Sequence, residues 1–208
     1  MTTVSDLVDR VLTQLYEATD SPIHWSRDEI THAINEAVGV IHRAGLNSQT
    51  NADVLDSFYV TKSVSLDAGT KQTLPASGAE KGAQFVMVHS VNNRAVTSFS
   101  PRAMDAVKPR WVTSTGQQPR QFARDRDVRI FWVYPGARSG DTAEIAYIRE
   151  PEALAEGDAA PFESKYDQAL IDFALYRAYS KDTEYAGQDG RAAAHYSAFR
   201  DGVFNGAG

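Results

Sequence analysis

Apolar residues recur at helical spacing at both ends of the chain and at strand spacing in its middle. Near the N-terminus, the 3.6-residue period of an amphipathic helix is followed by Leu7, Val8, Val11, Leu12 and Leu15. Thr3 with Asp6 has the pattern of a cap for this helix. A second helix is predicted to begin with a capping box formed by Ser26 and Glu29, and to stop at Gly45. The two helices are predicted to form a hairpin.

Between residues 51 and 150 the apolar positions change to the two-residue period of half-buried strands. Strands are predicted over residues 58–66, 71–75, 84–91, 128–135 and 142–148. Turns at 67–70 and 136–140 are predicted to join the first two and the last two of these strands. A short helix is predicted over 100–107, with Ser100 as its cap. This region is therefore predicted to be a small antiparallel β unit with one short helix.

Helical periodicity returns after the proline- and alanine-containing segment 151–161. A third helix is predicted over 166–185 and a fourth over about 190–204. This order predicts an α+β fold, in which the N- and C-terminal helix pairs form a helical bundle with an inserted antiparallel β domain. The predicted domains are residues 1–50, 51–150 and 151–208.

The third predicted helix has two apolar faces, whereas a surface helix needs only one. The first face is formed by Tyr166, Ala169, Leu170, Phe173 and Tyr176. The second face is formed by Ile171, Ala174, Leu175, Ala178 and Tyr179. Other helices of the same chain or a neighbouring copy of the protein could cover the second face, and the sequence leaves both coverings open.

Composition limits where this protein works. The 208 residues include no cysteine, which excludes disulfides and thiolate metal sites. No apolar run approaches the ~20 residues that a membrane-spanning helix needs. The N-terminal stretch lacks the basic start and apolar core of a signal peptide. We therefore expect a protein that is made in a cytoplasm and has no membrane partner.

The net charge of −6 is unevenly distributed along the chain. Seven acids face three bases in residues 1–50, and ten acids face five bases in residues 151–208. The central residues 51–150 instead carry thirteen bases and ten acids, with the bases concentrated in 94–138. Such a basic stretch can contact phosphates or an acidic partner, or it can simply form a solvated surface.

The sequence offers little that resembles a catalytic or metal site. Glu29 and His32 have the E-x-x-H spacing found in di-iron bundles, but the required second pair is absent and the capping box already accounts for Glu29. The sequence also lacks G-x-S-x-G, Walker-type and G-x-G-x-x-G patterns. We therefore predict no enzyme, no metal and no cofactor.

Aromatic residues and arginines are interleaved in the second half of the β unit. The aromatic residues are Trp111, Phe122, Phe131, Trp132 and Tyr134, and the arginines are Arg110, Arg120, Arg124, Arg126 and Arg129. Such a pattern can stack on the bases of single-stranded nucleic acid. It also fits a strand core with a solvated rim, and no nucleic-acid motif accompanies it.

Four stretches, taken in order, are similar to a known family. They are WSRDEI with the following INEA (25–37), SVSLDAGTKQTLP (63–75), MDAVKPRW through to the strand ending in YP (104–135), and YDQALIDFALYRAYSKD through to HYSAF (166–199). In this order they resemble the head-to-tail adaptor proteins of tailed bacteriophages, which are ring-forming neck components between portal and tail. The resemblance extends over nearly the whole chain.

The resemblance implies a structural virion protein at the head-tail junction, made in the host bacterial cytoplasm. Its partners would be the portal protein, tail or nozzle proteins of the neck, and other copies of itself in a ring of about a dozen, a dodecamer. Genomic DNA would pass through the channel without sequence-specific binding. Another neck or tail-completion protein is one alternative, and a nucleic-acid-binding module that uses the arginine- and aromatic-rich strands is another.

The resemblance also assigns contact residues. Portal docking is expected of Tyr196, Phe199, Val203 and Phe204 in the last helix and tail. Contacts between subunits are expected of Tyr166, Phe173, Tyr176, Tyr179 and Tyr185. Contacts to neck or tail proteins are expected of Arg120, Arg124 and Arg126.

Overall fold

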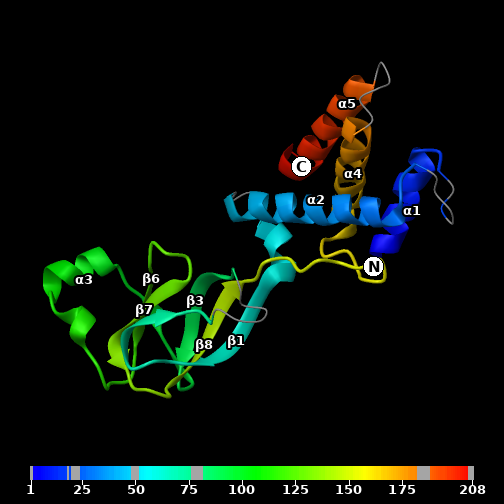
Figure 1. Ribbon diagram of the computed structural model, residues 1–208. Coiled ribbons are helices and arrows are strands. Elements are labelled where there is room, and N and C mark those ends of the chain that lie inside the picture. Colours follow the sequence, from blue (N-terminus) through cyan, green and yellow to red (C-terminus); the bar gives the residue numbers. More distant parts are fainter. Residues whose placement is uncertain are drawn as a thin grey trace. The chain divides into compact units, whose positions relative to one another are not determined.

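The computed structural model contains helices and two antiparallel-rich sheets, which confirms the predicted α+β class (Figure 1). It describes residues 2–17, 19, 24–47, 52–75, 82–181 and 188–205. The chain divides into two compact units. Unit 1 consists of Met1–Ser57 and Pro151–Gly208, and unit 2 consists of Phe58–Glu150.

Unit 1 is helical. Its main helices are α1 (Val4–Gln14), α2 (Arg27–Asn47), α4 (Asp167–Lys181) and α5 (Gln188–Arg200). A π-helical turn, η5 (Asp201–Asn205), continues α5, and two 3-10 helices, η1 (Ala52–Phe58) and η4 (Ser164–Tyr166), lead out of α2 and into α4.

The predicted cap of α1 and the predicted capping box of α2 are both present, and the cap of α1 is also a capping box. At α1 the backbone N–H of Asp6 donates to Thr3 Oγ1 over 3.2 Å, and the N–H of Thr3 donates to Asp6 Oδ2 over 2.9 Å. At α2 the N–H of Glu29 donates to Ser26 Oγ over 3.2 Å, and the N–H of Ser26 donates to Glu29 Oε2 over 3.3 Å. Each box satisfies two of the N–H groups that a helix start leaves without an intrahelical partner.

The predicted stop at Gly45 is wrong, because α2 continues to Asn47. Gly45 is buried, and a Cβ added to it would lie 3.1 Å from the side chain of Leu55. A glycine at this position therefore lets η1 approach the last turn of α2 closely, which is a packing role and not a helix end.

The centre of unit 1 is α4, which contacts α1, α2 and α5. Every residue from Ala169 to Leu175 is buried, on both of the apolar faces seen in the sequence. In Figure 1 α5 runs antiparallel to α4, whereas α2 runs across α4. The predicted bundle built from the N- and C-terminal helix pairs is therefore not confirmed, although residues on both faces of α4 are buried by helices of the same chain.

Unit 2 holds two four-stranded sheets, ordered β1-β8-β3-β4 and β2-β7-β6-β5. The strands are β1 (Tyr59–Ser65), β2 (Gly69–Thr73), β3 (Gln84–Val91), β4 (Arg94–Ala95), β5 (Thr97–Ser98), β6 (Gln121–Arg124), β7 (Ile130–Ala137) and β8 (Thr142–Ile148). The sequence predicted the five longer strands and missed the short β4, β5 and β6. The two sheets share one core, formed by Leu66, Leu74, Ala83, Phe85, Val88, Val91, Phe122, Phe131, Val133, Ala137, Ala143, Ile145 and Tyr147.

The two predicted turns do not close hairpins. β1 pairs with β8 and β2 pairs with β7, so the strands on either side of each turn lie in different sheets. The N–H of Leu66 donates to Asp141 O over 2.7 Å and the N–H of Gly140 donates to Leu66 O over 3.1 Å, which continues the pairing across the bend. A two-stranded ribbon therefore turns a corner here and passes from one sheet to the other.

The predicted short helix is α3 (Pro101–Val107), with Ser100 as its cap and Pro101 at its first position. The backbone N–H of Ala103 donates to Ser100 Oγ over 3.4 Å. After α3 the chain makes one 3-10 turn, η3 (Trp111–Thr113), and Trp111 packs edge-on against Phe99 and Trp132. These aromatic contacts attach the segment that carries α3 to the β2-β7-β6-β5 sheet.

Candidate docking surfaces

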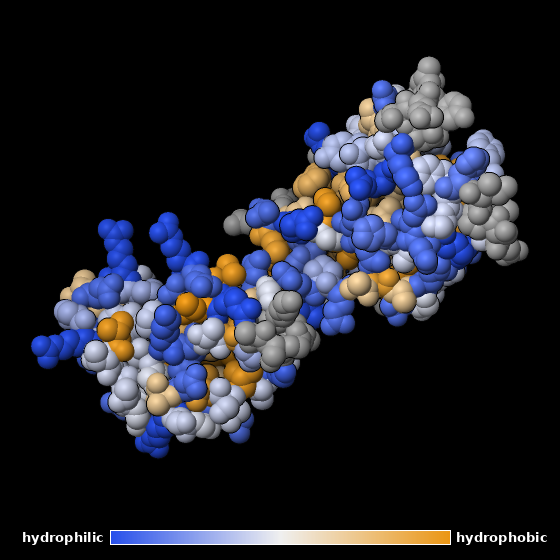
Figure 2. All heavy atoms as spheres, in the orientation of Figure 1, coloured by the Kyte–Doolittle hydropathy of each residue, from blue (hydrophilic) through white to orange (hydrophobic). Residues whose placement is uncertain are grey.

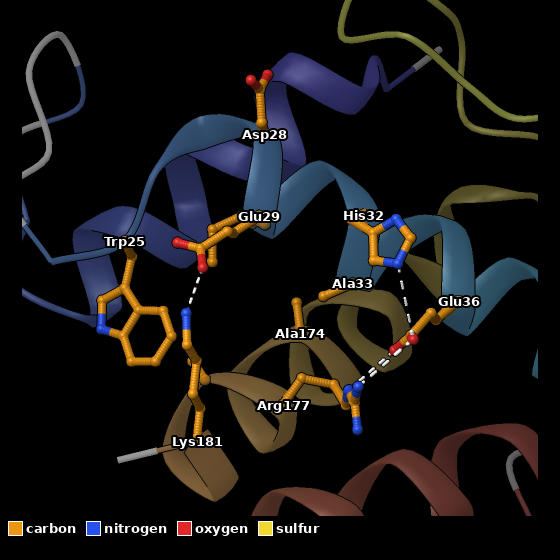
Figure 3. Close-up of a pocket in the computed structure, with 11 residues that line it drawn as sticks. Trp25, Asp28, Glu29, His32, Ala33, Glu36, Ala174, Arg177 and Lys181 are labelled. Atoms are coloured by element: carbon orange, nitrogen blue, oxygen red, sulfur yellow. Dashed lines mark hydrogen bonds and ion pairs between the residues drawn. The ribbon is translucent and has the colours of Figure 1, made fainter.

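A groove of about 320 Å³ lies between α2 and α4 in unit 1. Its apolar lining consists of Trp25, Ile30, Ala33, Ala174 and Ala178. Figure 3 shows Ala33 and Ala174 facing one another across the groove. Small residues on both helices leave this space open, because no long side chain from either helix fills it.

Two ion pairs join α2 to α4 along the groove (Figure 3). Arg177 Nε lies 2.8 Å from Glu36 Oε2, and Lys181 Nζ pairs with Glu29. The hydrogen bond from Lys181 is the main reason that the pKa of Glu29 lies below its ordinary value. The rim is therefore charged and the lining apolar, which is the arrangement of a protein-docking site.

The E-x-x-H pair of the sequence, Glu29 and His32, lies on this rim, and the two side chains contact different partners. Glu29 is engaged by Lys181 and by the capping box, and His32 Nε2 lies 3.9 Å from Glu36 Oε1. Within the described parts of the chain, no group of three or more histidine, aspartate or glutamate side chains could hold a metal ion.

The four residues expected to dock on the portal divide into two pairs. Phe199 and Val203 are buried, at 1% and 2% exposure, and Phe199 packs against Phe173 of α4. Tyr196 and Phe204 are 43% and 47% exposed. The buried pair fixes the C-terminal segment to α4, and the exposed pair is available to a partner.

The residues expected at subunit contacts are mostly used inside unit 1. Tyr166 and Phe173 are buried, and the hydroxyl of Tyr166 donates to Asp53 Oδ2 over 3.2 Å. Burial is the main cause that raises the pKa of Tyr166. Tyr176 and Tyr179 are partly buried.

These two partly buried tyrosines pack on α5. Tyr176 packs on Tyr196, and Tyr179 stacks on His195, whose Nδ1 lies 2.8 Å from the buried carboxylate of Asp172. Tyr185 lies outside the described residues.

The arginines expected to contact neck or tail proteins belong to unit 2. Arg120, Arg124 and Arg126 are exposed, in and beside the short strand β6. Arg124 Nη2 also donates to the backbone oxygen of Phe85 over 3.1 Å, which attaches it to β3. Arg120 and Arg126 are therefore the more accessible of the three.

The aromatic residues interleaved with these arginines are packed rather than displayed. Trp111, Phe122 and Phe131 are buried, and Trp132 and Tyr134 are partly buried against Trp111. Base stacking needs accessible ring faces. The arrangement therefore favours the interpretation of a strand core with a solvated basic rim.

Sequence reasoning missed one feature of unit 2, the display of α3. None of its residues is buried, and Val107 is 81% exposed. The only sequence signal was an apolar stripe on a helix too short to be judged by its periodicity. Both α3 and the groove are therefore surfaces that the structure adds to those predicted.

Two comparisons complete the description. Residues 2–205 match the SU10 adaptor protein family. A search of curated proteins finds no match. Among the described residues, no helix is long and apolar enough to cross a membrane.

Proposed function

The chain belongs to the SU10 adaptor protein family, and from this premise we propose that it forms a ring beneath the portal of a tailed bacteriophage. The ring joins the DNA-filled head to the tail and leaves a channel through which the genome passes without sequence-specific binding. The family match, which extends over nearly the whole chain, is the observation that carries this proposal.

The C-terminal segment supports the portal end of the proposal. In α5 only Ala192 and Phe199 are buried among the described side chains, so the helix packs on α4 by one narrow face. Its other faces remain open for a partner. Tyr196 and Phe204 are the large apolar residues on this open surface, and aromatic side chains of this kind dominate binding energy at many interfaces.

Unit 2 supports the proposed contacts with neck or tail proteins. It carries thirteen bases and eight acids, and Arg120 and Arg126 project from the region of β6. A basic surface attracts acidic neighbours over a distance of about 8 Å at physiological ionic strength. Neck or tail proteins with acidic surfaces are the partners that this unit would recognise.

The test is to mix the purified full-length protein with assembled portal rings from the same phage and to image the product by electron microscopy. We expect a second ring stacked coaxially on the portal. The double variant Tyr196→Ser/Phe204→Ser should lose stacking, while the control Val128→Ser, an equally exposed apolar residue of unit 2, should keep it. Well-formed portal rings that stay bare in the presence of folded protein would overturn the proposal.

A further inference from the structure

The helix α3 is held in place without burying any of its own residues. Seven residues are too few for a stable isolated helix, because such helices are marginal below ~12–15 residues. External anchors supply the missing stability: Trp111 Nε1 donates to Asp105 Oδ1 over 2.7 Å, and Lys108 Nζ donates to the hydroxyl of Tyr134 over 2.7 Å. The helix is therefore fixed to its sheet and presents an uncovered face.

That uncovered face is apolar with a basic border. Ala103, Ala106 and Val107 have the spacing that places them on one side of a helix, and all three are exposed. Arg102 precedes this stripe and Arg110 follows it, and both are exposed. Figure 2 shows the pattern on the part of unit 2 that carries α3, where apolar atoms lie at the surface beside projecting hydrophilic side chains.

The charges of the two units show which surface suits this face. Unit 2 carries thirteen bases and eight acids, a net charge of +5. Unit 1 carries eight bases and nineteen acids, a net charge of −11. A second copy of the chain therefore offers a strongly acidic helical surface to the basic surroundings of α3, and opposite charges favour the encounter.

We propose that α3 of one copy docks on the groove between α2 and α4 of a neighbouring copy, with Val107 inserted into the groove. The groove is apolar and holds about 320 Å³, enough for one branched side chain and not for a whole helix. Val107 is a single branched apolar side chain, and it is 81% exposed. Burying it removes apolar surface from water, which favours association.

Acidic side chains on the rim of the groove face the basic border of α3 in this arrangement. Asp28 and Glu36 lie eight residues apart on the groove side of α2, a rise of about 12 Å. Arg102 lies in the first turn of α3 and Arg110 lies three residues beyond its last residue, so basic side chains flank Val107 along the chain. Glu36 is already paired with Arg177, so the contact from these arginines falls to Asp28. Asp28 makes no ion pair within the described part of the chain and is exposed, so it is available for this contact.

The inference rests on the proposed function, because it needs copies that are held side by side. A cross-linking experiment can distinguish failure of the inference from failure of the proposed function. The chain has no cysteine, so single cysteines report specific proximities. Val107→Cys protein is mixed with His32→Cys protein, since the His32 side chain is 79% exposed on the groove rim. A short bis-maleimide is then added, with and without portal rings. The matched control pairs Val128→Cys with His32→Cys, because Val128 is also an exposed valine of unit 2.

We expect at least about tenfold more cross-linked dimer from the Val107 pair than from the Val128 pair, which corresponds to about 1.4 kcal/mol of preference. Stacked rings with equal yields for both pairs would overturn the inference and leave the proposed function standing. A Val107-specific cross-link in solution, with portal rings left bare, would support the inference and overturn the proposed function.

Two further outcomes would also overturn the inference. One is absence of the Val107-specific product under both conditions. The other is an efficient link within single molecules of a Val107→Cys/His32→Cys double variant at high dilution, since α3 would then belong to its own groove. Salt-dependent binding of α3 to DNA, lost in Arg102→Glu/Arg110→Glu, without any cross-link between copies would assign the surface to nucleic acid instead.

Discussion

Phe173 on α4 and Phe199 on α5 meet edge to face, with ring centroids 5.0 Å apart and planes inclined by 65°. Phe173 is 7% exposed and Phe199 is 1% exposed, so the contact closes one apolar face of α4 inside the chain. Such a ring pair contributes about 0.5–1.5 kcal/mol beyond the area that it buries. The first apolar face of α4 is therefore covered by α5, whereas Ala174 and Ala178 of the second face line the groove between α2 and α4.

Replacing Phe199 with alanine should destabilise unit 1 by about 3–5 kcal/mol, because it removes a fully buried ring and leaves a cavity against α4. Urea denaturation followed by helical circular dichroism measures the loss. The control Phe204→Ala removes a ring that is 47% exposed and should shift the midpoint far less. Equal midpoints for the two variants would contradict the packing of α5 on α4.

The helices could be predicted because their signals are local. The capping box of Ser26 with Glu29 joins residues three apart, and the apolar stripes repeat every turn. The groove could not be predicted, because its facing residues Ala33 and Ala174 are far apart in the chain and small residues carry no pattern of their own. For the predicted docking residues, periodicity places Phe199 and Tyr196 in an apolar pattern but does not say which of them faces α4.

Strand pairing shows the same limit more clearly. The register that pairs Tyr59 with Ile148 joins opposite ends of unit 2, whereas the turn at 67–70 suggests a local hairpin. The core between the two sheets supports the observed pairing, since Leu66 and Phe131 are both buried in it. Long-range burial of this kind leaves no local signature in the sequence.

Replacing Arg27 should lower the stability of unit 1 even though Arg27 is not part of the apolar core. Its guanidinium donates to Asp9 Oδ1 over 2.6 Å, to Glu156 Oε2 over 2.9 Å and to Ser5 Oγ over 3.0 Å, so it joins α1, α2 and the segment before α4. We expect Arg27→Ala to cost about 2 kcal/mol, because hydrogen bonds to charged groups contribute about 1.5–3 kcal/mol. Thermal unfolding measures the loss.

The companion variant Arg27→Lys tests whether geometry or charge matters. A lysine keeps the positive charge but cannot direct separate N–H groups to Asp9 and Glu156 at once. It should therefore recover less than half of the lost stability. Full recovery by lysine would show that charge alone is sufficient.

The ion pair of Asp53 with Lys165 predicts a pH dependence of stability. The hydrogen bond from Lys165 is the main cause that holds the pKa of Asp53 below its ordinary value of 3.8. A folded-state pKa below the unfolded value gives stability that is present above pH 3.8 and is lost as the pH falls through the folded value. The stability difference between wild type and Asp53→Asn should therefore be larger at pH 6 than at pH 3.

The cause is tested in the same experiment. In a Lys165→Met background the pH-dependent part of the Asp53→Asn effect should shrink, because its largest source has been removed. Urea unfolding of the four proteins across this pH range supplies the double-mutant cycle. A pH-dependent difference that is unchanged without Lys165 would assign the depressed pKa to another neighbour.

Gly136 of β7 should tolerate no side chain, because the backbone of Ser114 lies against it. This contact helps to hold the segment that follows α3 on the sheet. A Cβ at this position would lie 1.9 Å from the backbone oxygen of Ser114, and the N–H of Gly136 donates to Ser114 Oγ over 3.2 Å. Because backbone and not a flexible side chain opposes the new methyl group, Gly136→Ala must displace the segment that links Trp111 to the sheet. We expect a loss of about 1–3 kcal/mol from overpacking.

Tryptophan fluorescence during urea unfolding follows this change, because Trp111 and Trp132 pack together beside the affected segment. The control is Gly157→Ala, where an added Cβ meets nothing within 4 Å and little change is expected. If α3 docks on a neighbouring copy, Gly136→Ala should also lower the Val107-specific cross-link under conditions where unit 2 remains folded, since the anchor of α3 is displaced. A Gly136→Ala protein as stable as Gly157→Ala would mean that the segment at Ser114 yields without cost, and α3 could not then be rigidly presented.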